Sequence, residues 1–332
     1  MKALRIVRPG SEDGIELAEV PEPECGPADL LVQVRASALN RADLLQTLGR
    51  YPPPPDVPQD IPGLEYAGTV LSTGPRARRF RPGDRVMGLV GGGAFAERLV
   101  THEREALPLP DGLDFAPAAA VPEAFLTAFD ALVLQGGLRP NSRVLIHAVA
   151  SGVGTAALQL VHAFRGQALG TARTAEKLER CQAIAPFQAL AIEAGEPRFA
   201  DRVLAVTNGE GVDVVLDLVG GRYLAESLGC LASRGRLMQV GTLDGHRADL
   251  DLRQLMGRRA QIVGTVLRSR PLEEKIALAR SFEAQVLPDL ASGRLKPVVD
   301  VVLPMRDVRA ALSRMSSNAS VGKLVLAWEA TS

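Results

Sequence analysis

Five apolar runs between residues 143 and 267 alternate with segments of helical periodicity, and this alternation restricts the fold more than any other feature. The runs are RVLIHAV (143–149), QALGTA (167–172), VDVVLDLV (212–219), RLMQVG (236–241) and QIVGTVL (261–267). Their hydrophobicity is continuous rather than alternating, which is typical of parallel strands buried on both faces. We therefore predict an α/β domain whose doubly wound parallel sheet is covered by helices.

The connection after the first run has the pattern of a dinucleotide-binding turn. Gly152 and Gly154 permit a tight turn, and GVGTAA matches G-x-G-x-x-A, although Val149 and Ser151 stand where further glycines are expected. Helical spacing then places an apolar stripe on one face: Val153, Ala156, Ala157, Leu160, Val161 and Phe164. The N-terminus of such a helix suits a pyrophosphate. A glycine turn without a ligand is the alternative, but the surrounding alternation favours a Rossmann-type nucleotide domain.

The end of the second run indicates which dinucleotide the turn would hold. An NAD-specific domain needs an acidic side chain there, which bonds the ribose 2′-hydroxyl. Arg173, Thr174 and Lys177 occupy this place instead, and two cations with a hydroxyl suit a 2′-phosphate. Thr174 also fits the cap of the next helix, and Glu176 at its second position complements the helix dipole. We predict NADPH, with a solvated, charged helix start as the alternative.

The first third of the chain has short β-branched runs separated by Gly and Pro. LLVQVRASAL (30–39), EYAGTVLST (65–73), GDRVMGLV (83–90) and AFAERLVT (94–101) predict a mostly β domain. The six prolines of GRYPPPPDVPQDIPG (49–63) exclude a helix and ladder pairing, so this segment is expected to be an extended loop.

The last part of the chain is expected to return to the β-rich domain. LEEKIALARSFEAQVLPDLASG (272–293) predicts one helix, and KPVVDVVLP (296–304) and KLVLAW (323–328) predict two strands that suit the first domain. We therefore expect the nucleotide domain, 122–267, to be inserted between residues 1–121 and residues 268–332.

Composition excludes several classes of protein. Lys plus Arg (38) equals Asp plus Glu (38), so no nucleic-acid or anionic membrane surface is expected. The charged N-terminus and the lack of a long apolar run argue against a signal peptide and a membrane span. Cys25, Cys181 and Cys230 are far apart, which predicts buried thiols without disulfides in a cytoplasmic chain.

Motifs of other chemistries are missing. None of the three tyrosines is followed four residues later by Lys, so the Tyr-x-x-x-Lys pair of short-chain dehydrogenases is absent. The four histidines have no metal-binding spacing, and no metal site is predicted. No G-x-S-x-G motif or P-loop occurs. His147, in the first apolar run, is expected to be a core or loop histidine with satisfied hydrogen bonds.

Taken together, these motifs resemble the medium-chain dehydrogenase/reductase superfamily, and more narrowly its zinc-free quinone oxidoreductases. The similarity covers essentially the whole chain, and ASALNRADLLQTLGRYPPPP (36–55) with PEAFLTAF (122–129) is closest to the p53-inducible quinone oxidoreductase type. The resemblance implies that the β-rich domain is GroES-like and catalytic. Zinc-dependent relatives have Cys in place of Asn40 and His in place of Leu64, so zinc-independent chemistry is implied.

The resemblance also assigns residues to a site. Asn40 and Thr127 would face the nicotinamide, and Tyr51 would line the substrate mouth; these three are the candidate catalytic residues. Ala191-Ile192-Glu193 replaces the Asn-Tyr that the family has after the third strand. The other cofactor positions are Ser151, Gly152, Val153 and Gly154 at the pyrophosphate, Arg173, Thr174 and Lys177 at the 2′-phosphate, Val219 near the adenine, Val240, Gly241, Val266 and Leu267 at the nicotinamide ribose, and Lys323.

These assignments imply an NADPH:quinone oxidoreductase that transfers hydride from nicotinamide C4 to a quinone in the interdomain cleft. Two alternatives remain open: an NADPH-dependent reductase of enones or enoyl thioesters, and an NADPH-binding protein without catalysis. Tyr51 either donates a hydrogen bond to the acceptor or closes the proline-rich loop. Pairing of QIVGTVL across a two-fold axis, as in the family, predicts a homodimer.

Overall fold

The computed structural model describes residues 1–192 and 197–328. The chain divides into two compact units, of which the first comprises Met1–Leu126 with Leu267–Ser332 and the second comprises Thr127–Val266. Helix α3 (Pro122–Phe129) carries the chain from the first unit into the second.

The second unit contains a parallel sheet of six strands in the order β10-β9-β8-β11-β12-β13. The chain runs outward from β8 through β9 to β10 and then returns to β11, so the strand order reverses between β8 and β11. In open α/β sheets such a switch point is where ligands bind, at the carboxyl ends of the strands. The strands are β8 (Arg143–Ile146), β9 (Gln167–Ala172), β10 (Gln188–Ala191), β11 (Val212–Asp217), β12 (Leu231–Gln239) and β13 (Gln261–Gly264).

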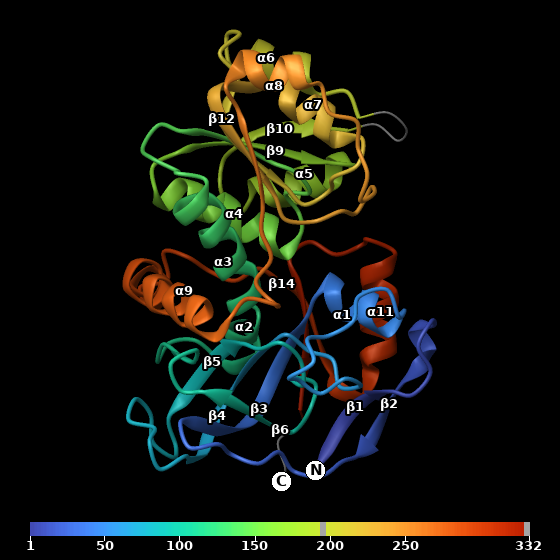
Figure 1. Cartoon of the computed structure of the whole chain (residues 1–332), viewed down its shortest axis with the longest axis vertical. Helices are drawn as coiled ribbons and strands as arrows, with labels where there is room; N and C mark the ends of the chain where they lie inside the picture. The colour runs from blue at the N-terminus through green and yellow to red at the C-terminus, as the bar shows by residue number, and fades with distance from the viewer. Residues whose placement is uncertain (193–196, 329–332) are drawn as a thin grey trace. The chain divides into compact units, whose positions relative to one another are not determined.

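Helices cover both faces of this sheet, which confirms the predicted doubly wound α/β fold. Figure 1 shows α6 (Ala200–Val206), α7 (Tyr223–Gly229) and α8 (Leu252–Arg258) on one face, with α4 (Gly152–Ala163) and α5 (Ala175–Gln182) on the other. Leu145 packs with Phe199 and Leu228 in one core cluster, while its neighbours Val144 and Ile146 are also fully buried. Burial on both faces explains the continuous apolar runs.

Helix α4 is buried on more sides than a single apolar stripe predicts. Every residue from Gly154 to Val161 is buried. Thr155 and Gln159 each donate a side-chain hydrogen bond within the helix: Thr155 Oγ1 to Gly152 O (3.0 Å) and Gln159 Nε2 to Thr155 O (3.2 Å). Back-bonding of this kind allows polar side chains to be buried on a helix.

The first unit contains a sheet of seven strands in the order β14-β15-β3-β4-β5-β7, with β6 also paired to β3. Strand β15 pairs antiparallel with β3, so the end of the chain completes the sheet that its first third begins. A separate hairpin is formed by β1 (Lys2–Ile6) and β2 (Ile15–Glu19). The strands of the large sheet are β3 (Asp29–Leu39), β4 (Glu65–Thr73), β5 (Arg85–Leu89), β6 (Arg98–His102), β7 (Leu107–Pro108), β14 (Val299–Pro304) and β15 (Lys323–Ala327).

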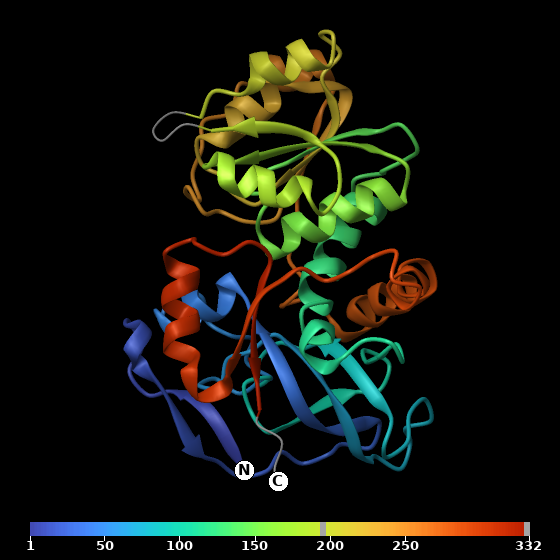
Figure 2. The same ribbon diagram turned by 180° about the vertical axis from the view of Figure 1, so that it is seen from behind.

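Short helices flank this sheet. Figure 2 shows α11 (Val308–Ser316) beside β14 and β15, and residues of α11 share a core cluster with Leu324 and Leu326 of β15. The remaining helices of the unit are η1 (Glu12–Gly14), α1 (Arg41–Thr47), α2 (Phe115–Ala119), α9 (Leu272–Gln285), α10 (Leu287–Ala291) and η3 (Met305–Asp307), and a π-helix, η2 (Asp130–Gln135), lies in the second unit.

The prediction of one helix over residues 272–293 is wrong. The segment forms two helices, α9 and α10, and Val286 between them leaves the helical region with φ −120°. Pro288 lies in the first turn of α10; inside one continuous helix it would lack an N–H for the preceding turn and its ring would clash with that turn. A proline in the first turn of a new helix carries neither penalty.

The cysteines match the prediction only in part. All three are free, and Cys181 and Cys230 are buried, but Cys25 is half-buried, so the prediction of buried thiols is wrong there. The Cys25 thiol donates to Asp29 O at 3.4 Å, near the chain surface. Within residues 1–192 and 197–328, no helix has the length and apolar character that crossing a membrane requires.

Gly154 has no room for a side chain, and this leads to a stability prediction. A Cβ there would lie 2.5 Å from Ala148 O and 2.6 Å from Val149 O, which are backbone atoms that cannot move aside. We expect Gly154→Ala to lower the free energy of unfolding by about 3 kcal/mol, measured by urea denaturation. Gly257→Ala is the control, because nothing lies within 4 Å of its added Cβ in α8. Equal stability of the two variants would contradict the prediction.

Candidate active site

The predicted phosphate turn lies at the switch point of the parallel sheet. Ser151 is the N-cap of α4, and its Oγ accepts a hydrogen bond from Gly154 N at 3.0 Å. The first amides of a helix have no partner within the helix, so those of Gly152 and Val153 are available to an anion. The serine at a position where glycine was expected therefore has a structural role as the cap.

Val149 is accommodated by the neighbouring strand. The left-handed backbone conformation at the turn belongs to Ala148 (φ 50°), not to Val149. Val149 is fully buried and packs over Gly170 of β9, where an added Cβ would lie 3.0 Å from Val149 Cγ2. The bulk of the valine is thus matched by the missing side chain of Gly170.

The two cations predicted for a 2′-phosphate follow the adjacent strand. Because β8 and β9 are parallel neighbours, Arg173 after β9 lies at the same sheet edge as the turn after β8. Arg173 is exposed and Lys177 is half-buried. Thr174 caps α5, its Oγ1 accepting from Lys177 N at 3.4 Å, which confirms the predicted cap. Amides at one strand end and cations at the next fit a phosphorylated dinucleotide.

The other cofactor positions of the second unit lie at the same carboxyl edge. Val219 follows β11, and its N–H donates to Asp217 Oδ1 at 2.7 Å. Asp217 is fully buried, and within the described residues its Oδ2 has no partner. Val240 and Gly241 follow β12, and the exposed Val266 follows β13. Leu267 is buried and begins the returning part of the first unit.

His147 has both ring nitrogens in hydrogen bonds, as predicted for a core histidine. Nδ1 lies 2.9 Å from Thr171 Oγ1, and Nε2 lies 2.9 Å from Ser227 Oγ. Burial lowers the pKa of His147 to about 4, although the charge of Asp217 opposes the shift. The imidazole is therefore neutral at pH 7 and has a structural role.

The lowered pKa of His147 predicts a loss of stability in acid. The unfolded chain binds a proton at His147 near pH 6.5 and the folded chain only near pH 4, so this contribution is present above pH 6.5 and lost as pH falls toward 4. The difference corresponds to about 3 kcal/mol. Burial raises the pKa of Asp43 to about 6 and that of Glu105 to about 7. These two shifts have the opposite effect, because they make the folded chain more stable as pH falls.

The measurement therefore compares variants. Urea unfolding of the wild type and of His147→Asn between pH 7.5 and 4.5 should give stability curves that converge as pH falls, because only the wild type has the His147 contribution to lose. Parallel curves would show that His147 is protonated equally in the folded and unfolded chains.

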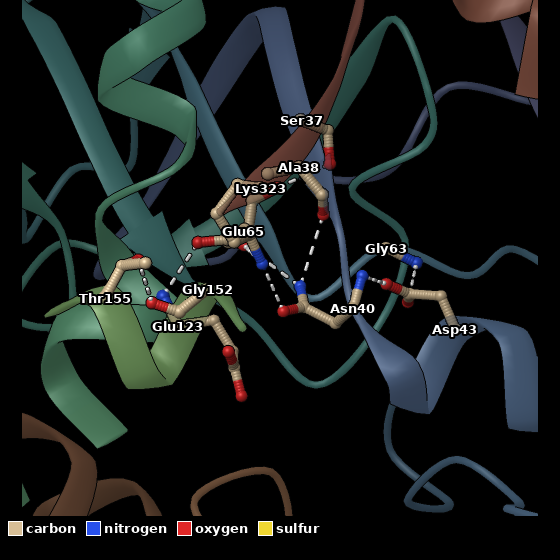
Figure 3. A network of polar contacts seen from close by, with 10 residues as sticks. All are labelled: Ser37, Ala38, Asn40, Asp43, Gly63, Glu65, Glu123, Gly152, Thr155 and Lys323. Atoms are coloured by element: carbon tan, nitrogen blue, oxygen red, sulfur yellow. Dashed lines mark hydrogen bonds and ion pairs between the residues drawn. The ribbon is translucent and has the colours of Figure 1, made fainter. Parts of the chain in front are cut away.

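A buried charge cluster lies in the first unit, at the ends of three neighbouring strands (Figure 3). Asn40 follows β3, Glu65 begins β4 and Lys323 begins β15; they are 6%, 0% and 5% exposed. Lys323 Nζ lies 2.7 Å from Glu65 Oε1 and donates to Asn40 Oδ1. Asn40 Nδ2 donates to Glu65 Oε1 (3.0 Å) and to Ala38 O (3.2 Å). The other carboxylate oxygen, Glu65 Oε2, accepts from Glu123 N at 2.8 Å.

The contacts within this cluster occupy the polar atoms that its residues could otherwise offer to a ligand. Lys323, a predicted cofactor residue, has its ammonium engaged by Glu65 and Asn40. The carboxamide of Asn40 is held in one orientation, and its backbone N–H donates to Asp43 Oδ2 (2.8 Å) in a capping box. Burial raises the pKa of Asp43, whose Oδ1 accepts from Gly63 N (2.9 Å).

The two remaining candidate catalytic residues differ in exposure. Thr127 is buried on α3. Tyr51 is half-buried at the start of the proline-rich loop, and its ring centroid lies 5.2 Å from Arg268 Cζ. The sequence reasoning missed Arg268 and gave Glu65 no role. An arginine directly after the last apolar run was the only available signal for Arg268.

Comparison with known proteins identifies the family. The alcohol dehydrogenase GroES-like domain matches residues 26–111, and the zinc-binding dehydrogenase family matches residues 191–326. The chain belongs to the medium-chain dehydrogenase/reductase superfamily. The resemblance to this superfamily is thereby confirmed. Within the described residues, no three His, Cys, Asp or Glu side chains group closely enough to hold a metal ion.

Relatives of this chain include parts of larger proteins. The erythronolide synthase EryA2 of Saccharopolyspora erythraea is 36% identical over 327 residues, which are 96% of this chain but 8% of the synthase. The chain thus spans a small fraction of this synthase and, likewise, 8% of the pikromycin polyketide synthase component PikAII of Streptomyces venezuelae.

Solved structures match this chain over almost its whole length. A quinone oxidoreductase of Pseudomonas syringae pv. tomato has a TM-score of 0.88 at 27% identity, over 98% of this chain and 99% of that one. A mycobacterial protein complexed with NADPH has a TM-score of 0.89 at 26% identity, over 98% and 100%. The CurK enoyl reductase has a TM-score of 0.86 at 25% identity, over 98% and 99%.

Proposed function

We propose that this medium-chain reductase is an NADPH-dependent, zinc-independent quinone oxidoreductase. The observation that carries the proposal is the ammonium of Lys323 bonded to Glu65 and to Asn40, the residue that stands where zinc-dependent relatives are expected to have a cysteine ligand. A lysine ammonium beside these groups repels a divalent cation and occupies the carboxylate. Without a Lewis acid to polarise a carbonyl, an electron-poor acceptor such as a quinone is the most suitable substrate.

The residues of the chain bind and orient, while NADPH, when bound, supplies a hydride from C4. The amides of Gly152 and Val153 hold the pyrophosphate, and Arg173 and Lys177 hold the 2′-phosphate. Tyr51 presents its ring and hydroxyl to the acceptor. Solvent supplies the proton that completes the reduced product. The likeness to the mycobacterial NADPH complex supports the cofactor, and the likeness to the Pseudomonas enzyme supports the acceptor.

An alkene reductase is the second candidate, because the CurK enoyl reductase and the polyketide synthases are also similar to this chain. Turnover of 1,2-naphthoquinone, a small enone and an enoyl thioester, measured side by side with NADPH, separates the two. Our proposal requires the highest kcat/KM for the quinone. A higher value for the thioester would assign the chain to the alkene reductases.

We also propose that the reductase is a cytoplasmic homodimer. Strand β13 is an edge strand, and Leu252, Met256 and Ile262 near it are exposed, Met256 by 69%. Exposed apolar side chains beside an unpaired strand edge are typical of an interface. Light scattering should give twice the mass of the chain for the wild type and a lower mass for Ile262→Lys. A monomeric wild type would refute the proposal.

A further inference from the structure

Arg268 is a buried charge with unused hydrogen-bonding capacity. It is 6% exposed and lies at the start of the segment that returns to the first unit. Nε donates to Gly91 O (2.7 Å) and Nη2 donates to Gln46 Oε1 (2.6 Å), while the buried Nη1 has no partner among the described residues. A buried polar group without a partner calls for an explanation, of which a bound ligand, ion or water is one.

No carboxylate in the described part of the chain forms an ion pair with this guanidinium. Its two acceptors are a carbonyl and an amide, both neutral. Asp43 attracts Arg268 from a distance, but the Asp43 oxygens accept from Asn40 N and Gly63 N. Burial lowers the pKa of Arg268, yet arginine remains protonated in proteins. The positive charge is therefore only partly balanced.

Arg268 contacts a loop, helix α1 and the ring of Tyr51. Gly91 belongs to a loop packed against the proline-rich loop, since a Cβ on Gly91 would lie 2.8 Å from Val57 Cγ1. Gln46 lies on α1, and its Nε2 donates to Gln59 O (3.2 Å). The half-buried Tyr51 ring lies over the guanidinium. Movement of the Tyr51 side chain would break neither hydrogen bond of Arg268, since neither involves Tyr51.

We propose that Nη1 of Arg268 donates a hydrogen bond to the carbonyl oxygen of the electron acceptor, with Tyr51 as the aromatic surface beside it. The inference rests on the proposed function. Hydride transfer would break the C4–H bond of NADPH and form an O–H or C–H bond on the quinone, so that NADPH is oxidised to NADP⁺ and the quinone is reduced to a monoanion with its charge on a conjugated oxygen. Arg268 stabilises that oxyanion and stays protonated, and a solvent proton then neutralises it. A fixed cation in a site of low dielectric is well suited to this role.

A purely structural role is the competing explanation, because the hydrogen bonds of Arg268 to Gly91 and Gln46 connect the Gly91 loop to α1. Arg268→Gln removes Nη1 and the positive charge. Gln46→Leu removes the hydrogen bond from Arg268 Nη2 to Gln46 but leaves Nη1 in place. Arg50→Gln, which changes an exposed arginine beside Tyr51, is the matched control. Melting temperature and NADPH affinity are measured for all variants, so that a loss of fold is recognised.

We expect Arg268→Gln to lower kcat/KM for 1,2-naphthoquinone about 100-fold, with NADPH affinity unchanged. Gln46→Leu and Arg50→Gln should stay within about threefold of the wild type. Added guanidinium ion should restore part of the activity of a smaller variant, Arg268→Ala. Activity that falls in step with melting temperature across Arg268→Gln and Gln46→Leu, without rescue, would overturn the proposal.

A binding experiment separates this inference from the proposed function. In the presence of NADP⁺, the anion of 2-hydroxy-1,4-naphthoquinone should bind the wild type, and Arg268→Gln should bind it at least tenfold more weakly. If binding of this anion depends on Arg268 but the protein reduces no quinone, the proposed quinone reductase activity is refuted and the oxyanion site is retained. Quinone turnover and binding that are both unaffected by Arg268→Gln would refute the site and retain the reductase.

Discussion

Replacing Lys323 with methionine is expected to lower the free energy of unfolding by about 4 kcal/mol, because removal of one partner leaves a buried charge uncompensated. Glu65 is fully buried, and Lys323 Nζ lies 2.7 Å from its Oε1. Methionine keeps much of the volume of lysine, so the loss reports on charge more than on packing. Urea denaturation at pH 7.5 measures it.

A double-mutant cycle shows that the loss belongs to the pair. Adding Glu65→Gln to Lys323→Met removes the stranded carboxylate and should recover about half of the lost stability, since a buried pair replaced on both sides is often close to neutral. Lys296→Met, on the loop before β14, is the control for the substitution itself. Additive effects of the two changes would show that Glu65 and Lys323 are not coupled.

The second large effect concerns the cofactor. The variant Arg173→Ala/Lys177→Ala is expected to lose about 1,000-fold in kcat/KM with NADPH, because two charge-assisted hydrogen bonds contribute roughly 1.5–3 kcal/mol each. With NADH, which has no 2′-phosphate, the change should stay within about threefold. Arg180→Ala is the control, because Arg180 lies on the exposed side of α5, the helix that also contains Lys177. An unchanged ratio of NADPH to NADH efficiency would refute the assignment of these cations.

The fold of the second unit was largely accessible from the sequence because its signals are local. Continuous apolar runs predicted β8, β9, β11, β12 and β13 but missed the four-residue β10, and the Gly152–Gly154 pattern predicted the turn and α4. Thr174 was correctly assigned as a cap because capping depends on residues three positions apart. The break at Val286 was missed, although Pro288 inside the segment predicted as one helix was a signal for it.

The charge cluster was not accessible in the same way. Glu65 is 25 residues from Asn40 and Lys323 is 283, and only the pairing of β15 with β3 and of β3 with β4 brings them together. Their role depends on register, which composition and periodicity do not specify. Arg268 was missed for a related reason, because an arginine after an apolar run ordinarily lies in solvent.

The central claim is that this chain uses NADPH to reduce an electron-poor acceptor without a metal. The most direct test follows NADPH oxidation at 340 nm with protein dialysed against EDTA, with and without 1,2-naphthoquinone. Our account predicts little oxidation without the quinone, a rate that rises to saturation with it, and no gain on adding Zn²⁺. Tight NADPH binding without a quinone-dependent rate, or a rate that appears only with Zn²⁺, would contradict it.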